Sequence, residues 1–324
     1  MKRNGKRISI LLALAAFGAM LLGSDAALTG AQEGVSVCAR VIIPGLLPCL
    51  ILAGLLTRLG IPALLGRFLT PVTSRLFRVS GAGAAAFVLG VSGGYPLGAA
   101  TVAELRRQGE ISPEEGSRLL GFCNNSGPAF LVGAIGAGVF HSTRLGLLLY
   151  GAHVLAAALT GVLLARLSHK PYKLCKPKVQ IQAIPLSQAF TAAAAAGAEA
   201  MVRICAFVVF FAAAGRVLWQ MPGVAALPLV LHDATGIPLQ AVRALFQGLL
   251  ELGSGAAALS GMPLSPASAA LAAFLAGWGG VSVIFQTLAV TAGTETKAAL
   301  HLAGRLCTGL ISAGIVYWVL RFFL

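Results

Sequence analysis

Leu119 to Phe140 reads LLGFCNNSGPAFLVGAIGAGVF, and this stretch decides how the chain folds. It has about the length of a membrane-spanning helix, roughly 20 residues, but Asn124-Asn125-Ser126-Gly127-Pro128 interrupts its middle. In hydrocarbon every backbone N–H and C=O needs a partner within the protein, so a broken helix persists only where it is buried in protein or lines a cavity. The interruption therefore predicts either a substrate or ion site or a polar joint between packed helices.

The composition is that of a polytopic membrane protein. Of the 324 residues, 57% are hydrophobic and 10% are charged, and the mean hydropathy is +0.87, whereas a soluble domain carries roughly 25% charged residues. The net charge of +14 does not indicate a nucleic-acid partner, because the Lys and Arg residues lie in short loops between apolar runs. The six cysteines form no CxxC pair, so neither a disulfide framework nor a metal cluster is expected.

Three further apolar segments are interrupted in the same manner. Residues 81–103 contain SGGYP at positions 92–96, and because each half is only about ten residues, too short to span a bilayer, we expect a re-entrant hairpin. The segments 248–259 (GLLELGSGAAAL) and 277–286 (GWGGVSVIFQ) follow the first hairpin and the first break by about 160 residues. These matched offsets indicate a duplication.

The sequence thus predicts an all-α polytopic membrane protein with an inverted-topology repeat, two re-entrant helical hairpins and two broken transmembrane helices, as in many secondary transporters. With the N-terminus in the cytoplasm, 17 of the 24 Lys and Arg residues lie inside, 4 outside and 3 within or at the edge of spans, which agrees with the positive-inside rule. The expected units are an N-terminal transmembrane helix (1–34), a first repeat (35–165) with an amphipathic interfacial segment at 58–80, a basic cytoplasmic linker (166–190) and the inverted second repeat (191–324).

The two hairpin tips and the two helix breaks are expected to converge on a substrate site. The N-termini of broken helices carry partial positive charge and bind anions, and side-chain hydroxyls and amides add hydrogen-bond donors. The predicted substrate-binding residues are Ser92, Gly93, Gly94, Tyr95, Asn124, Asn125, Ser126, Glu251, Ser254, Gly280, Ser282 and Gln286.

Several of these residues have a structural alternative. Glu251 is an acid within a hairpin, which predicts either binding or coupling to a cation, H⁺ or Na⁺, or an ion pair with Arg203 or Arg243. Gln286 could equally be a packing amide, and Tyr95 could equally anchor the hairpin tip.

Other polar residues are expected to be structural. Arg203 follows Glu199 by four residues, so a local ion pair on one helix face is expected. His153 and His301 are expected to be hydrogen-bonded packing residues. Ser112-Pro113, with acids on either side, is typical of a helix N-terminus.

The sequence contains none of the P-loop, GxSxG and HExxH motifs, so we expect neither an enzyme nor a bound cofactor or metal. The expected partners are a small organic anion and the lipid bilayer, with no nucleic acid. A homo-oligomer is compatible with the sequence, but no segment displays an unambiguous interface.

SGGYPLGA, FCNNSGPAFLVGAIGAGVF, ELGSG and GWGGVSVIFQ together resemble the sporulation integral membrane protein (YlbJ) family of endospore-forming Firmicutes. That family belongs to a wider nucleoside-recognition "Gate" group, and its repeat is similar to that of concentrative nucleoside transporters and of the ferrous-iron transporter's membrane domain. The resemblance covers roughly residues 35–320. It implies a multi-pass protein of the cell or forespore membrane that acts in sporulation and moves dipicolinate toward the forespore for cortex and core maturation.

Three functional hypotheses follow. The preferred one is a secondary transporter or facilitator for a small organic anion, used in sporulation. A nucleoside transporter would take up nucleoside without competition by dicarboxylates. A membrane scaffold that does not transport would tolerate alanine at Asn124, Ser126 and Glu251.

Overall fold

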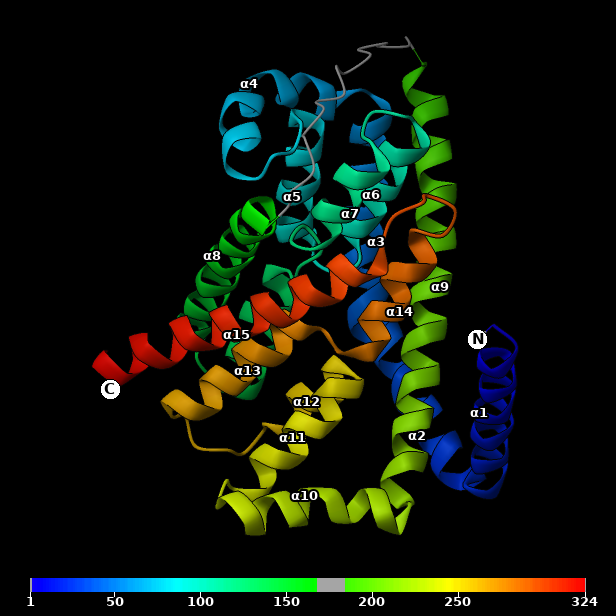
Figure 1. Cartoon of the computed structure of the whole chain (residues 1–324), viewed down its shortest axis with the longest axis vertical. Coiled ribbons are helices and arrows are strands. Elements are labelled where there is room, and N and C mark those ends of the chain that lie inside the picture. The colour runs from blue at the N-terminus through cyan, green and yellow to red at the C-terminus, as the bar shows by residue number, and fades with distance from the viewer. Residues whose placement is uncertain (1, 168–183, 324) are drawn as a thin grey trace.

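The computed structural model describes residues 2–167 and 184–323, and within these ranges all regular elements are helices (Figure 1). Four of these helices are long and apolar enough to cross a membrane, or up to six spans result if each of two sharply bent helix pairs is one span. The chain is therefore an all-α polytopic membrane protein, as the sequence predicted.

The first half of the chain ends with a single long span after a series of shorter helices. Its elements are α1 (Lys2–Leu22), α2 (Ser24–Val37), the π-helical η1 (Cys38–Ile42), α3 (Ile43–Arg58), α4 (Ile61–Leu76), α5 (Gly81–Gly93), α6 (Leu97–Arg107), α7 (Pro113–Leu120), the π-helical η2 (Ala129–Val139) and α8 (Thr143–Leu167).

The second half repeats this order: a long helix, a crosswise helix, a hairpin, a broken helix and a final span. Its elements are α9 (Leu186–Gln220), α10 (Pro222–Thr235), α11 (Leu239–Leu250), α12 (Leu252–Ala258), α13 (Pro266–Trp278), α14 (Gly280–Val290) and α15 (Ala298–Phe323). The two crosswise helices, α4 and α10, lie at opposite ends of the molecule (Figure 1). An inverted repeat requires this placement.

The continuous helical run α2–η1–α3 packs against α9 in antiparallel orientation. A methyl group at Gly30 would lie 2.6 Å from the Ala212 carbonyl oxygen, whereas one at Gly54 would lie 3.4 Å from the Ala193 side chain. Later residues of α2–η1–α3 therefore contact earlier residues of α9, so the two run in opposite directions. α9 has 35 residues, or about 52 Å at 1.5 Å per residue, which exceeds the roughly 30 Å of a bilayer core.

Both predicted hairpins are present. The arms α5 and α6 meet at Gly90 and Gly98, where an added methyl group on Gly90 would lie 3.1 Å from the Gly98 Cα. The arms α11 and α12 meet at Gly248 and Gly255 in the same manner, with a corresponding distance of 2.2 Å. The absence of a side chain at these positions is what allows two short helical arms to fold back on each other.

Several predicted boundaries shift. The expected boundary after residue 34 falls inside α2, because the π-helical turn η1 carries the helix from α2 into α3, with the Ile43 N–H bonded to the Cys38 carbonyl. α9 begins at Leu186, within the expected linker, and residues 168–183 of that linker lie outside the described residues. The helix α10 was not anticipated from the sequence.

The helix start at Ser112-Pro113 is confirmed, and it belongs to the arm of the first broken helix. The Ser112 Oγ accepts the Glu115 N–H at 3.1 Å, and Pro113 occupies the first helical turn. The arm before the break thus runs over Pro113–Leu120, so it begins six residues before Leu119, where the interrupted stretch was expected to begin. Capping satisfies a helix start whose N–H groups would otherwise lack partners.

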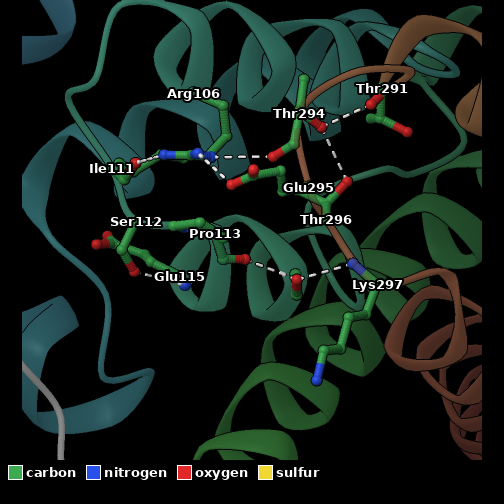
Figure 2. A network of polar contacts seen from close by, with 11 residues as sticks. Arg106, Ile111, Ser112, Pro113, Glu115, Thr291, Thr294, Glu295, Thr296 and Lys297 are labelled. Carbon is green, nitrogen blue, oxygen red and sulfur yellow. Dashed lines mark hydrogen bonds and ion pairs between the residues drawn. The ribbon is translucent and has the colours of Figure 1, made fainter.

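The loop that follows α14 binds the last turn of α6 and the helix α7, and so ties the two halves of the chain together (Figure 2). The Arg106 Nε donates to the Thr294 carbonyl at 3.2 Å, and its Nη2 lies 3.8 Å from Glu295. The Lys297 N–H donates to the Ser117 Oγ at 2.9 Å. These contacts fix the first half of one broken helix relative to the end of the other.

Glycines allow the spans to approach closely, as is common where no hydrophobic effect drives helix association in lipid. At Gly304 of α15, a methyl group would lie 1.8 Å from the carbonyl oxygen of Gly121, next to the first break. At Gly314 of the same helix, a methyl group would meet nothing within 4 Å. Position 304 is therefore the tighter of the two by a wide margin.

We expect Gly304→Ala to destabilise the protein by about 1–3 kcal/mol or more, because overpacking forces the backbone apart. Gly314→Ala is the matched control and should be neutral or slightly stabilising, since alanine favours helix. Thermal unfolding of both purified variants in detergent measures the difference. Equal unfolding midpoints would show that α15 does not pack on the first break as described.

Candidate functional site

Three cavities follow one another along the long antiparallel helix pair. A first vestibule of about 360 Å³ lies between α3, α6 and the N-terminal half of α9. A second, of about 600 Å³, lies between α2, the C-terminal half of α9 and the second hairpin. Between them, along α9, is a central cavity of about 150 Å³.

The central cavity is where both hairpin tips and both broken helices meet. α2, η1 and α9 form one wall, and the opposite wall carries side chains from each of the four interrupted elements. The polar and aromatic residues of that wall are Tyr95, Ser126, Phe130, Glu251 and Gln286. The convergence of the four elements was expected from the sequence, and the structure places it at one cavity.

The central cavity adjoins one vestibule and is separated from the other. It shares the wall residues Val37, Val208, Glu251 and Gly253 with the second vestibule. Toward the first vestibule, an apolar cluster intervenes that includes Leu50, Leu97, Met201 and Ile204. A ligand in the central cavity would therefore exchange with the second vestibule in this conformation.

The first hairpin tip rests on the first helix break. Gly94 has φ +87°, and a methyl group there would lie 2.9 Å from the Gly127 nitrogen. Both the conformation and the contact require glycine. Tyr95 follows, buried, and its hydroxyl donates to the Ala276 carbonyl at 2.8 Å. The tip of repeat 1 is thereby anchored to the last turn of α13 in repeat 2.

The first break is completely buried and hydrogen-bonded across the repeats. The Asn124 Nδ2 donates to the Thr287 Oγ1 at 2.8 Å, and the Ser126 Oγ donates to the Ala276 carbonyl at 3.0 Å. The Ser126 N–H donates to Nε2 of His153 at 3.1 Å. Of the three polar residues at the break, only Ser126 lines the central cavity.

In the second hairpin, Glu251 caps the helix that follows it. Its carboxylate accepts the N–H groups of Gly253 at 2.9 Å and Ser254 at 2.6 Å, and also the Ser254 hydroxyl at 2.9 Å. Among the ion pairs found between described residues, none joins Glu251 to an arginine. The expected alternative, a pair with Arg203 or Arg243, is therefore not what holds this acid.

The second break consists of Gly279 and Gly280, both with positive φ. A methyl group at Gly280 would lie 3.1 Å from the Gly248 and Leu250 carbonyls, so this break nests on its own hairpin tip, as the first does. Gln286 is nearly buried, lines the central cavity and donates to the Ser282 Oγ at 3.2 Å. Ser282 lies behind it and does not reach the cavity.

The predicted site residues divide into two groups. The structure brings six of them to the central cavity: Gly93, Gly94, Tyr95, Ser126, Glu251 and Gln286. The other six do not line it: Ser92, Asn124, Asn125, Ser254, Gly280 and Ser282. Ser92 is exposed and bonds to the carbonyl of Val88, while the two asparagines are fully buried joints between helices.

Polar residues for which the sequence predicted no ligand role lie behind this wall or beside the first broken helix. Arg305 is fully buried and donates to the Tyr95 hydroxyl at 2.8 Å. His153 and His301 are also buried, and each bonds to the first broken helix or its break. The position of Arg305 within the apolar run of α15 could have marked it as a functional candidate, because ionisable residues inside spans are rare. The expectation that the histidines are hydrogen-bonded agrees with these contacts.

The ion pair expected between Glu199 and Arg203 is confirmed at 2.5 Å. Arg203 also lines the first vestibule, together with Arg58 and Arg107 and the acids Glu104 and Glu199. This vestibule therefore has a mixed charged surface, unlike the mainly apolar lining of the central cavity, in which Glu251 is the one charged residue among those that the structure describes.

We expect Asn124→Ala to cost about 1–3 kcal/mol of stability, because the Ala99 N–H, which the Asn124 Oδ1 accepts at 3.4 Å, would be left buried without a partner. Gln108→Ala is the control, since that exposed amide bonds only to Glu104. Unfolding midpoints of the purified variants provide the comparison. An unchanged midpoint for Asn124→Ala would mean that this amide is free for a ligand instead.

No family model matches the chain, and no solved structure matches it. The sporulation integral membrane protein YlbJ of Bacillus subtilis (strain 168) is 27% identical over 314 residues, an alignment that covers 90% of this chain and 77% of the relative. The similarity thus extends through both repeats, with both hairpins and both breaks. The chain is therefore similar, over most of its length, to a sporulation integral membrane protein.

Proposed function

We propose that this protein is a secondary transporter or facilitator that moves a small organic anion, dipicolinate, across a forespore membrane during sporulation. The similarity to a sporulation integral membrane protein supports the role in sporulation. The observation that carries the transport proposal is the central cavity, walled by both hairpin tips and both broken helices and placed between two vestibules. Inverted repeats that surround a central site are the arrangement used by secondary transporters.

The size and lining of the cavity favour a small planar ligand. Pockets for drug-sized ligands are roughly 300–1,000 Å³, whereas this one is about 150 Å³. The aromatic rings of Tyr95 and Phe130 offer flat apolar surface, and Ser126 and Gln286 offer polar groups. Dipicolinate, a single aromatic ring with two carboxylates, matches this combination better than a nucleoside, which adds a bulky ribose.

The helix ends that surround the cavity support an anion. Ala129, the first residue of η2, lines the cavity, so the N-terminal end of that half-helix faces it. The C-terminal end of α13 carries partial negative charge, but its Ala276 carbonyl already accepts hydrogen bonds from the Tyr95 and Ser126 hydroxyls. Amide ends directed at a cavity favour negative charge.

Glu251 is the residue we propose for cation coupling. Its carboxylate lies on the wall that the central cavity shares with the second vestibule, where H⁺ or Na⁺ could reach it. The cap on α12 holds the carboxylate at this position. Coupling would let the inward movement of an anion be driven by a cation gradient.

Proteoliposomes loaded with terbium test this proposal, because entering dipicolinate chelates terbium and raises its luminescence. We expect uptake by the wild type well above that of empty liposomes. Gln286→Leu, which removes a polar group from the cavity wall at nearly constant volume, should lower the uptake rate at least severalfold. Ser92→Ala, a change outside the cavity, should not.

Excess uridine should leave dipicolinate uptake unchanged. Inhibition by uridine would favour the nucleoside transporter. If the folded wild type gives no uptake above empty liposomes, the scaffold hypothesis would be preferred.

A further inference from the structure

Arg305 is a buried cation that has no carboxylate partner among the described residues. It is fully buried, and none of the ion pairs found in the described part of the chain includes it. Its Nη1 donates to the Tyr95 hydroxyl at 2.8 Å and its Nη2 to the Asn125 Oδ1 at 3.5 Å, while its Nε has no partner. Arginine stays protonated in proteins, so one positive charge is fixed here without a counter-ion.

A buried charge that lacks a counter-ion is costly, because desolvation is not offset by an opposite charge. Neighbouring groups do not supply one. The Nε2 of His153 accepts a backbone N–H from Ser126, so it carries no proton and that ring is neutral. Tyr95 adds only its ring, 5.7 Å from the guanidinium carbon, and its hydroxyl. Among the described residues, two hydrogen bonds to neutral groups are what Arg305 makes in place of an ion pair with a counter-ion.

Tyr95 connects this charge to the central cavity, because the residue lines the cavity and its hydroxyl accepts a hydrogen bond from Arg305. The same hydroxyl donates its own proton to the Ala276 carbonyl at 2.8 Å. The Ser126 hydroxyl donates to that same carbonyl, which keeps a partner if Tyr95 turns. The Tyr95 proton can therefore be redirected to a ligand oxygen, and hydrogen bonds in a chain strengthen one another.

Resting on the function proposed above, we propose that Arg305 is the residue that makes the central cavity select carboxylates. It polarises the Tyr95 hydroxyl, which donates to a carboxylate of the ligand. The ligand carboxylate then becomes the counter-charge that Arg305 lacks. Arg305 is in this sense a positioning residue, and Tyr95 is the group that contacts the anion.

The charged residue that lines the cavity itself has the opposite sign. The Glu251 carboxylate accepts three hydrogen bonds from Gly253 and Ser254. Glu251 also lines the second vestibule. Its carboxylate disfavours an anion, so Arg305 has to outweigh it. Neutralising the two residues separately should therefore change anion preference in opposite directions.

The test compares two ligands of the same shape by calorimetry on the full-length protein in detergent: pyridine-2,6-dicarboxylate and the neutral pyridine-2,6-dicarboxamide. The quantity measured is the ratio of their dissociation constants. A unit charge about 6 Å from a carboxylate, at an effective dielectric of about 20, changes affinity on the order of 100-fold.

We expect Arg305→Gln to reduce the preference for the dicarboxylate on the order of 10- to 100-fold, with the affinity for the dicarboxamide nearly unchanged. Arg305→Lys should restore most of the preference, Tyr95→Phe should reduce it severalfold, and Glu251→Gln should increase it. If Arg305→Gln does not fold, Tyr95→Phe and Glu251→Gln still carry the test.

Unchanged preference in folded Arg305→Gln or Tyr95→Phe would overturn the assignment and leave the proposed function intact. If Arg305→Gln lost affinity for both ligands equally, and Arg305→Lys did not restore it, Arg305 would have a structural role instead. A folded wild type that binds no dicarboxylate at millimolar concentration would overturn the proposed function and this assignment together.

Discussion

The structure depends on one constraint: at each helix break, backbone and side-chain polar groups must find partners inside the protein, because lipid offers none. The Ala276 carbonyl at the end of α13 accepts the hydroxyls of Tyr95 and Ser126, and Thr287 of α14 accepts the amide of Asn124. Each repeat thus supplies partners that the other lacks. The two repeats form one body because neither break could persist in lipid alone.

This arrangement also explains where a cavity can exist. The helices α2, η1 and α9 form one wall, and the interrupted elements face it with tips whose backbone is not fully helical. Irregular backbone is tolerated at membrane depth where it lines a cavity. The glycines at positions 94, 127, 279 and 280 let tips and breaks touch, and the residual space between them and the wall becomes the central cavity.

The sequence predicted the elements better than their polar contacts. Matched interruptions about 160 residues apart revealed the repeat, both hairpins and both breaks, because helix-breaking residues in an apolar segment act locally. Which polar side chain faces the cavity depends instead on tertiary packing. Asn124 was expected at a ligand and serves as a joint between helices, whereas Ser126, two residues on, lines the cavity. Arg305 could be recognised as unusual within α15, but its bond to Tyr95, 210 residues away, could not.

We propose that the central cavity holds a small anion between the two repeats. The most direct measurement is an experimental structure of the full-length protein in a lipid nanodisc with saturating dipicolinate. We expect ligand density between Tyr95, Ser126 and Gln286, with one carboxylate against the Tyr95 hydroxyl. An empty central cavity under saturating ligand, or density only in a vestibule, would contradict it.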